Sequence, residues 1–412
     1  MFKTLGERAK KAERVLMTAS TERKNEALRK IAESLKENSD YIIEQNNIDI
    51  ENARENGMSE SMIDRLTLTK ERIESIAGAV LEIVSYDDPC GKVISGAKRP
   101  NGILIEKVTV PMGVIAVIFE ARPNVTVDAA ALCLKSGNSV ILRGGKEAIN
   151  SNKATAKIMR EALASANLPE DCIQLVEDTS RESSLALMKM NGYVDVLIPR
   201  GGAGLIRACV ENSTVPVIET GTGNCHIYID KDADFEMAKE IVFNAKTSRV
   251  SVCNACESLV VHKDIAEKIL PVLKEKLDTK NVKWHGDETV CSIIPDCIPA
   301  TEEDYGKEYL DYEISVKVVS DIDEAISHIM KYSTGHSECI ITENYAASRK
   351  FTSEVDAAAV YVNASTRFTD GGEFGFGAEI GISTQKLHAR GPLGLPELTT
   401  FKYTVYGNGQ VR

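Results

Sequence analysis

The sequence has no apolar run approaching the roughly 20 residues that a membrane-spanning helix needs. Its first residues lack the apolar core of a signal peptide. It also has no low-complexity tract, and 43% of its residues are apolar, which is typical of a globular protein. The net charge of −12 argues against nucleic acid or an anionic membrane surface as the main partner. We therefore expect a soluble, cytoplasmic protein with no nucleic-acid or membrane partner.

The chain lacks the residue pattern of a structural metal site. Cys253 and Cys256 have the Cys-x-x-Cys spacing of metal ligands, but no second such pair exists, and structural zinc takes four ligands. Cys291 and Cys297 are separated by five residues in a proline-containing stretch. Most of the ten cysteines fall in predicted strands and helices, as reduced core thiols of cytosolic proteins do. We predict no metal, and the six histidines form no apparent Ser-His-Asp set.

The pattern of apolar residues predicts an α/β protein. At 412 residues the chain exceeds one ordinary core, which favours two or three domains. Residues 2–84 have helical periodicity. Short apolar runs then alternate with helical stretches, which predicts parallel sheets covered on both faces. The first predicted strands are Val114–Ile118, Val140–Leu142, Ile173–Val176, Val194–Ile198 and Val215–Ile218.

A second α/β set follows in the later half of the chain. Its predicted strands are Leu259–His262, Ser315–Val319, Cys339–Thr342 and Ala358–Val362. Two further segments, residues 102–110 and Glu397–Tyr406, alternate between apolar and polar residues. We expect these two segments to pair as a small β-extension.

One cysteine stands where a reactive thiol would be useful. Cys253 lies between a predicted helix and a predicted strand, close in sequence to Lys246 and Arg249. The thiolate is the nucleophile, and nearby cations favour it. Glu219 precedes Cys253 in a Glu-x-Gly-x-Gly turn, an arrangement that suggests acyl-thioenzyme chemistry. Cys256 adjoins the following strand and is interpreted as a packed thiol.

Two glycine-rich strand ends are candidates for binding a cofactor, although the Gly-x-Gly-x-x-Gly fingerprint is absent from the first strand. Glycines at such junctions let backbone N–H groups approach phosphates, and tight turns are the competing explanation. The cations of the first junction favour a 2′-phosphorylated nicotinamide cofactor. The residues concerned are Arg143, Gly144, Gly145 and Lys146 at one junction and Arg200, Gly201 and Gly202 at the other.

Several motifs together resemble the gamma-glutamyl phosphate reductases, a branch of the aldehyde dehydrogenase superfamily. The resemblance extends over essentially the whole chain. It is carried by Ile118-Phe-Glu-Ala-Arg-Pro-Asn-Val-Thr-Val-Asp128, Glu219-Thr-Gly-Thr-Gly-Asn-Cys-His226, Val252-Cys-Asn-Ala255 and the stretch from Asn363 to Gly377.

The resemblance implies both an architecture and a reaction. It implies a cofactor-binding α/β domain of residues 1–94 and 109–222, a catalytic α/β domain of residues 223–390, and a β-arm of residues 95–108 and 391–412 that mediates oligomerisation. The implied reaction is NADPH-dependent reduction of L-glutamyl 5-phosphate to L-glutamate 5-semialdehyde, with release of phosphate, in L-proline biosynthesis. A homo-oligomer and contact with the upstream glutamate kinase are the implied partners.

The resemblance also implies residue roles. Cys253 matches the nucleophile that carries a glutamyl thioester, with Glu219 and Asn254 in support. Glu308 resembles a cofactor-ribose contact. The substrate bears an α-carboxylate, an α-ammonium and a phosphate, so its site needs fixed cations, and guanidinium groups bind carboxylate and phosphate bidentately. The competing role for each arginine is a salt bridge that organises a loop. The expected substrate-binding residues are Arg122, Asn124, His226, Arg249, Asn363 and Arg367.

Two other functions stay open on the sequence alone. A hydrolytic NAD(P)-dependent aldehyde dehydrogenase would use Glu219 to activate water and would release a free acid. A non-catalytic thiol-sensing module would use Cys253 and Cys256 as a redox pair. The density of site-like motifs favours the reductase over both.

Overall fold

The computed structural model describes residues 2–412, which divide into two compact units. Unit 1 comprises residues up to Thr220 together with 375–381 and 393–412, and unit 2 comprises 221–374 and 382–392. The division between them falls two residues before the expected 222/223 boundary, and residues 375–381 join unit 1. As predicted, the fold is mixed α/β with parallel sheets. Within residues 2–412 no helix is long and apolar enough to cross a membrane.

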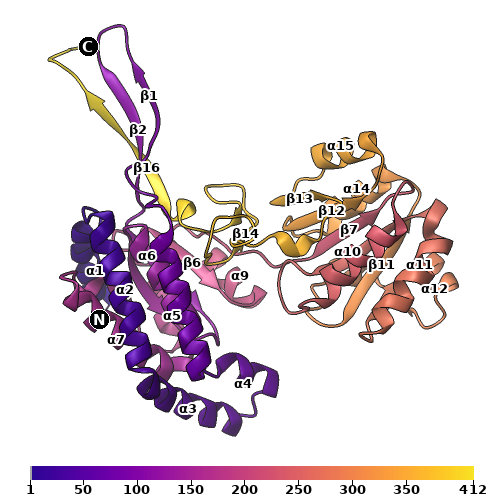
Figure 1. Ribbon diagram of the computed structural model, residues 1–412, viewed down its shortest axis with the longest axis horizontal. Coiled ribbons are helices and arrows are strands. Elements are labelled where there is room, and N and C mark those ends of the chain that lie inside the picture. Colours follow the sequence, from indigo (N-terminus) through magenta and orange to yellow (C-terminus); the bar gives the residue numbers. More distant parts are fainter. Residues whose placement is uncertain (1) are drawn as a thin grey trace. The chain divides into compact units, whose positions relative to one another are not determined.

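Five helices open unit 1: α1 (Phe2–Leu16), α2 (Thr21–Glu37), α3 (Ser39–Glu55), α4 (Glu60–Leu66) and α5 (Lys70–Ser85). Two of them begin at hydroxyl caps, because Ser20 accepts from the Arg23 N–H and Thr69 from the Arg72 N–H. The apolar residues of α2 at helical spacing are buried, as the periodicity predicts. Figure 1 shows α2 and α5 running side by side.

A four-stranded parallel sheet forms the core of unit 1, in the order β5-β4-β3-β6. Its strands are β3 (Val114–Phe119), β4 (Ser139–Arg143), β5 (Ile173–Leu175) and β6 (Val196–Arg200). The predicted strand Val215–Ile218 forms only one parallel bridge, between Val217 and Leu197. Pro216 has no N–H to donate to a ladder, which limits this segment to a single bridge.

Helices cover both faces of that sheet. Alternate residues of β3, namely Val114, Ala116 and Ile118, pack with apolar residues of α1, α8 (Arg181–Met188) and α9 (Ala203–Asn212). Helices α6 (Asn124–Lys135) and α7 (Ile149–Ser165) contact the sheet as well and pack on α2 and α5. Every residue of β3 is buried, which explains why its sequence is a continuous apolar run. The short helices η1 (Lys146–Ala148) and η2 (Glu170–Cys172) complete this region.

Unit 2 contains a seven-stranded sheet in the order β10-β9-β11-β8-β7-β12-β13, and every pair in it is parallel. Its strands are β7 (Cys225–Ile229), β8 (Cys256–His262), β9 (Lys283–Gly286), β10 (Ile298–Pro299), β11 (Glu313–Val319), β12 (Ser337–Ile341) and β13 (Ala359–Val362). The sequence pattern predicts β8, β11, β12 and β13. It misses β7, β9 and β10, of which β7 lies inside the sheet between β8 and β12.

The two faces of the unit 2 sheet carry separate apolar clusters. Ile227 and Ile229 of β7 face α10 (Phe235–Thr247) and α11 (Lys263–Asp278). Tyr228, between them in sequence, belongs to the cluster of α14 (Ile322–Tyr332) and α15 (Tyr345–Glu354), as the alternation of side chains along a strand requires. The remaining elements are α12 (Glu288–Ile293), α13 (Glu302–Tyr305), η3 (Thr366–Phe368), β14 (Ile382–Ser383) and β15 (Gly391–Pro392).

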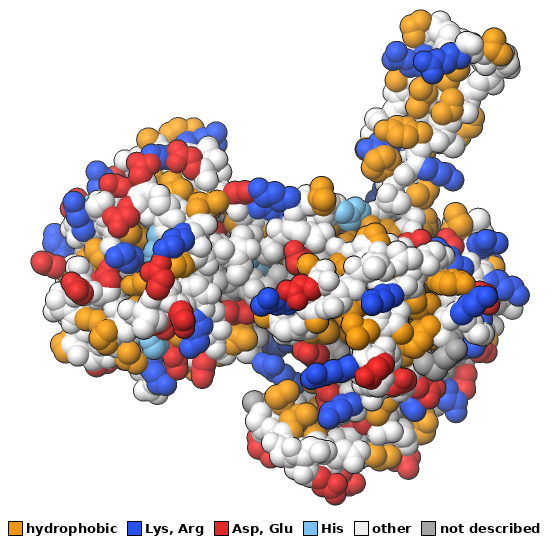
Figure 2. All heavy atoms as spheres, turned by 180° about the vertical axis from the view of Figure 1, so that it is seen from behind, with side chains coloured by type: hydrophobic (Ala, Val, Ile, Leu, Met, Phe, Trp, Pro, Cys, Tyr) orange, Lys and Arg blue, Asp and Glu red, His pale blue; other side chains and the backbone are white. Residues whose placement is uncertain are grey.

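A three-stranded antiparallel ribbon, which we call the β-arm, extends from unit 1 (Figure 1). Strand β2 (Leu104–Pro111) lies between β1 (Val93–Lys98) and β16 (Thr399–Tyr406), and η4 (Pro396–Leu398) precedes β16. The expected pairing of the two alternating segments is confirmed by the register from Thr399 opposite Pro111 to Tyr406 opposite Leu104. Apolar and cationic side chains both gather on the arm in Figure 2.

Candidate active site

Cys253 lies in the turn between the end of α10 and the start of β8. Its side chain is half-buried, whereas Cys256, the first residue of β8, is fully buried. Burial raises the pKa of the Cys256 thiol, which keeps that sulfur protonated. Of the two cysteines, only Cys253 has the access that a nucleophile requires.

The backbone of Cys253 is held from one side by the residues that lead into β7. A Cβ added to Gly223 would lie 1.4 Å from the Cys253 carbonyl oxygen, so only glycine fits there. The Gly223 N–H donates to Glu308 Oε1 at 2.7 Å. The Cys225 thiol donates to the Cys253 carbonyl at 3.1 Å. Glu308, the residue expected to contact the cofactor ribose, thus holds the turn that contacts the Cys253 backbone.

On the other side, Asn254 and Arg367 connect the Cys253 turn to η3. The Asn254 amide donates to the carbonyls of Arg367 and Thr369 at 3.2 and 3.0 Å. Its Oδ1 accepts from Arg367, and its backbone carbonyl accepts from the Thr366 hydroxyl at 2.8 Å. Arg367 also donates to Ser248 Oγ at 3.1 Å. The polar atoms of Asn254 are therefore committed to holding the turn.

Of the two cations expected beside the Cys253 thiol, Lys246 and Arg249, one is paired with a carboxylate. Burial lowers the pKa of Arg367 and the charge of Arg249 lowers it further, while Asp370 and the Cys253 thiol act in the opposite direction. Arg367 therefore places positive charge near Cys253, and Arg249 lies near Arg367. Lys246 is different, because it is fully buried in an ion pair with Glu257 at 2.6 Å. Its charge is compensated by that carboxylate.

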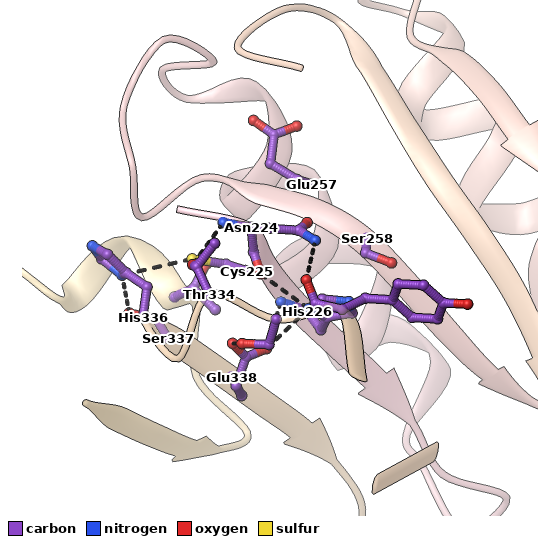
Figure 3. Close-up of polar contacts among 12 residues, drawn as sticks. Asn224, Cys225, His226, Glu257, Ser258, Thr334, His336, Ser337 and Glu338 are labelled. Carbon is purple, nitrogen blue, oxygen red and sulfur yellow. Dashed lines mark hydrogen bonds and ion pairs between the residues drawn. The ribbon is translucent and has the colours of Figure 1, made fainter. Parts of the chain in front are cut away.

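A buried polar cluster supports the start of β7 (Figure 3). The Asn224 amide donates to the carbonyls of Tyr305 and Tyr332 at 2.7 and 2.9 Å. His226 is fully buried, and its N–H donates to Glu338 Oε2 at 2.8 Å. His336 Nδ1 lies 3.7 Å from the Cys225 sulfur, and burial lowers the pKa of His336 to about 4. Because His226 is fully buried, it supports the start of β7, and its expected substrate contact stays a prediction.

In unit 1 the two glycine-rich junctions lie on either side of one strand end. Ile118 pairs with Arg143, and Phe119 pairs with Arg200. Parallel strands end at the same edge of the sheet, where α/β proteins bind ligands. The register thus brings together the two junctions that the sequence singled out.

At the first junction, neighbouring side chains enclose most of the backbone. Gly144 and Gly145 are buried, and Cβ atoms there would lie 2.2 Å from Asn152 Nδ2 and 2.1 Å from Glu147 Oε1. Arg143 donates to the carbonyls of Thr179 and Ser180 at 2.7 and 2.8 Å. Only Lys146 is exposed. The cationic group available to a ligand at this junction is therefore Lys146.

The second junction is open. Residues 201–204 are exposed, and a Cβ on Gly204 would have no neighbour within 4 Å. Helix α9 begins directly after Gly202, which as a glycine makes no side-chain cap hydrogen bond. The Gly202 N–H donates to Glu120 Oε2 at 2.9 Å. A helix N-terminus with glycine backbone suits a phosphate, so these residues fit the pyrophosphate of a dinucleotide once the Glu120 carboxylate leaves the Gly202 N–H.

The remaining predicted site residues have local partners. The Asn124 amide donates to Asp128 Oδ2 at 2.8 Å. Asn363, which follows β13, exchanges hydrogen bonds of 2.9 Å with the backbone of Thr342. Arg122 is half-buried ahead of α6, and Glu219 is half-buried near the end of the first segment of unit 1.

Three residues that the sequence did not single out as site residues have a close backbone contact or a shifted pKa in the structure. Gly223 and Cys225 contact the Cys253 backbone. Burial raises the pKa of Asp128 to about 6. All three lie within the quoted motifs, but only the tertiary structure shows their contacts. Among residues 2–412, no three His, Cys, Asp or Glu side chains are grouped so that they could hold a metal ion.

Comparison with known proteins gives consistent matches. Residues 2–293 match the aldehyde dehydrogenase family. Gamma-glutamyl phosphate reductase of Clostridium botulinum (strain Eklund 17B / Type B) is 61% identical over 407 residues, covering 99% of this chain and 98% of that protein. That of Clostridium perfringens (strain ATCC 13124) is 62% identical over the same shares. The crystal structure of the Thermotoga maritima gamma-glutamyl phosphate reductase is 52% identical, with a TM-score of 0.98 and 99% of each chain covered.

Proposed function

The chain belongs to the gamma-glutamyl phosphate reductases of the aldehyde dehydrogenase family, and from this membership we propose that it reduces L-glutamyl 5-phosphate to L-glutamate 5-semialdehyde and releases phosphate. NADPH is the proposed reductant and L-proline biosynthesis the proposed pathway. The observation that best supports this function is the half-buried Cys253, in a turn fixed by Gly223 and Asn254.

Cys253 acts as the nucleophile in this proposal. Its thiolate attacks the acyl-phosphate carbonyl and forms a thioester as phosphate leaves, which divides one difficult displacement into two easier steps. Arg367 and Arg249 supply positive charge that favours the thiolate. Because the Asn254 side chain is committed to two carbonyls, we assign oxyanion stabilisation to backbone N–H groups of the turn. When bound, NADPH supplies the hydride that converts the thioester to the aldehyde.

The cofactor has a proposed location in unit 1. The open backbone of residues 201–204 and the first turn of α9 would hold the pyrophosphate. Lys146 would contact the 2′-phosphate, since Arg143 is occupied by two carbonyls. Glu308 keeps one oxygen on the Gly223 N–H. Its other oxygen remains the proposed ribose contact, and this would couple cofactor binding to the Cys253 turn.

Cations would recognise the substrate. Its carboxylate and phosphate suit guanidinium groups, and Arg249, Arg367 and Arg122 keep this proposed role. Asn124 and Asn363 are better described as positioning residues, because their amides bond to Asp128 and to Thr342. Glu219 is proposed to support the thiol or the nicotinamide, since reduction of a thioester needs no activated water.

The hydrolytic alternative is separated from the reductase by phosphate. The reverse reaction of the reductase is phosphate-dependent reduction of NADP⁺ by glutamate 5-semialdehyde. We expect NADPH formation to require phosphate and to give an acyl phosphate, which hydroxylamine would trap. Equal rates without phosphate would instead establish the hydrolytic enzyme, with Glu219 as its general base.

The β-arm is the proposed oligomerisation surface. Both β1 and β16 are edge strands with unpaired backbone groups, and edges of this kind pair readily with another chain. Ile94, Tyr403 and Val405 are each more than half exposed, at 55%, 62% and 57%. Sedimentation of a variant lacking the apolar side chains of β16 should show a smaller species than the wild-type protein. A cytoplasmic location and contact with the glutamate kinase also remain proposals.

A further inference from the structure

Two cysteines that the proposed mechanism does not use lie side by side in unit 2. Cys291 is on α12, and Cys297 follows that helix just before β10. The Cys291 sulfur donates to the carbonyl of Cys297 at 3.8 Å and to that of Gly286 at 3.4 Å. A Cβ on Gly286 would lie 2.6 Å from the Cys297 sulfur. The two sulfurs therefore contact the same glycine at the end of β9.

Both thiols are half-buried, so small reagents can reach them while the surrounding backbone limits their movement. Burial and the hydrogen bond with Cys291 raise the pKa of the Cys297 thiol to about 12. The raised pKa disfavours the Cys297 thiolate, so we assign the first attack in the exchange proposed below to Cys291, an order that single variants test. The hydrogen bond from the Cys291 sulfur to the Cys297 carbonyl shows that the two residues are neighbours in the reduced protein.

A third observation connects the pair to the catalytic turn. Burial raises the pKa of Tyr305, on α13, and charge on several neighbours, among them Cys291, raises it further. The carbonyl of the same tyrosine accepts the hydrogen bond from Asn224 at 2.7 Å. Asn224 stands between Gly223 and Cys225, which both contact the Cys253 backbone. Tyr305 is thus hydrogen-bonded to the segment that contacts the Cys253 backbone, and its pKa responds to charge at Cys291.

We propose that Cys291 and Cys297 form a redox modification site that closes to an intramolecular disulfide by exchange with a low-molecular-weight disulfide. The Cys291 thiolate attacks one sulfur of the reagent, forms a mixed disulfide and expels one thiolate. The Cys297 sulfur then attacks the sulfur of Cys291, forms the protein disulfide and expels the second thiolate. The two protons lost by the protein protonate the two expelled thiolates. The protein dithiol is oxidised, and the reagent is reduced to two thiols.

The site is tested by mass spectrometry of the full-length protein. Trypsin releases residues 284–307, a peptide that contains Cys291 and Cys297 and no other cysteine. The protein is incubated with oxidised glutathione, alkylated after denaturation and digested without reductant. We expect this peptide to be lighter by two hydrogen atoms and unalkylated, and to recover two alkylation sites after treatment with dithiothreitol. Cys90, a half-buried thiol in unit 1, is the internal control and should show at most a glutathione adduct.

Single variants test the order of the two steps. Cys297→Ser should accumulate a glutathione adduct on Cys291, whereas Cys291→Ser should react much more slowly at Cys297 at the same pH. The proposal is overturned if the wild-type peptide keeps two alkylatable thiols, retains a glutathione adduct without closing, or cross-links to another peptide. None of these readouts depends on catalysis, so they stand whether or not the proposed reaction is correct.

A comparison of activities tests the connection through Tyr305. Oxidised glutathione also reaches Cys253 in every variant, so the Cys291→Ser/Cys297→Ser protein measures the loss that arises at Cys253 alone. The wild-type protein should lose activity faster than this double variant under the same conditions. Equal rates of loss would show that the disulfide does not affect the Cys253 turn.

Discussion

Gly223 packs directly on the backbone of Cys253, at a position where even a methyl group would lie 1.4 Å from the Cys253 carbonyl oxygen. Only glycine allows the two chain segments to approach this closely. Beside this contact, the Gly223 N–H donates to Glu308 and the Cys225 thiol donates to the Cys253 carbonyl. The position of the proposed nucleophile is therefore set by a contact between backbones.

Replacing Gly223 by Ala should remove most activity. The added methyl group must push the Cys253 turn away, and a displacement of about 1 Å can cost about 100-fold in rate. We expect kcat to fall by about that factor, with little change in the circular dichroism spectrum. Gly78→Ala is the control, because Gly78 is an exposed residue of α5 with no neighbour within 4 Å of a Cβ. It should leave activity unchanged and stabilise α5 by about 0.5–1 kcal/mol.

Cys253→Ala and Cys256→Ala should separate the nucleophile from the packed thiol. The first should abolish turnover while the protein stays folded, because no other sulfur replaces the lost one. The second should keep most activity and lower the free energy of unfolding by about 1 kcal/mol, since Cys256 is fully buried. Steady-state rates and urea unfolding provide the measurements. The opposite pattern would assign the chemistry to Cys256.

Arg367→Gln should slow alkylation of Cys253 by iodoacetamide at pH 7. The substitution removes a positive charge near the thiol, and one such charge at a partly exposed site is worth about 1 kcal/mol, or about fivefold in the thiolate population. Lys246→Gln should change this rate less, because Glu257 compensates the Lys246 charge. A larger effect at Lys246 than at Arg367 would contradict this account of the electrostatics.

Asp128 should make unit 1 less stable as the pH rises. Burial raises the pKa of Asp128 from 3.8 to about 6. Between these values the folded state holds a proton that the unfolded state has lost, so the free energy of unfolding falls as the pH rises through this window. Asp128→Asn removes this dependence and should stabilise unit 1 at pH 7 by on the order of 1–3 kcal/mol. Amide hydrogen exchange in α6 at pH 5 and pH 7 gives the measurement.

Asp88 is the matched control, because its shift has the opposite sign. Burial alone would raise the pKa of Asp88, but hydrogen bonds from Lys24, Cys90 and Thr21 outweigh burial and hold it below its usual value. Its contribution to stability is present at neutral pH and is lost as the pH falls through the lowered pKa. Asp88→Asn should destabilise unit 1 at pH 7. Stabilisation by both substitutions would mean that loss of charge alone is responsible.

Lys146→Gln should raise KM for NADPH more than for NADH. A hydrogen bond to a charged group is worth about 1.5–3 kcal/mol, which corresponds to a change in KM of about tenfold or more for NADPH. Arg143→Gln should affect both cofactors alike, because Arg143 holds the carbonyls of Thr179 and Ser180. Equal changes in KM for both cofactors in Lys146→Gln would exclude a role in reading the 2′-phosphate.

The strands that could be predicted most directly are those whose burial on both faces produces a continuous apolar run, such as β3 and residues 259–261 of β8. Strand β7 is equally buried, but His226 and Tyr228 interrupt its apolar pattern. The backbone N–H of His226 donates to Glu338 of the neighbouring β12, and that partner is distant in sequence. Its place between β8 and β12 could be recognised only from the pairing of strands.

In the candidate site, too, local sequence patterns predict the position of a residue but not its contacts with residues distant in sequence. The position of Cys253 between a helix and a strand follows from local patterns, and the structure has it there. The bond from Arg367 to Asn254 joins residues far apart in sequence, so no local pattern predicts it. The ion pair of Lys246 with Glu257, which reduces the effect of its charge on nearby groups, could not be predicted from its nearness in sequence to Cys253.

The pairing of β16 with β2 has a consequence for the order in which the protein is made. Unit 1 needs residues 375–381 and 393–412 in addition to its first 220 residues, and the Asn138 amide donates to the carbonyl of Leu398 at 2.8 Å. During synthesis these late segments emerge only after residues 221–374 of unit 2. Domains generally fold as they emerge. Unit 1, although its first 220 residues are made first, can therefore complete its fold only after residues 221–374 of unit 2 have been made.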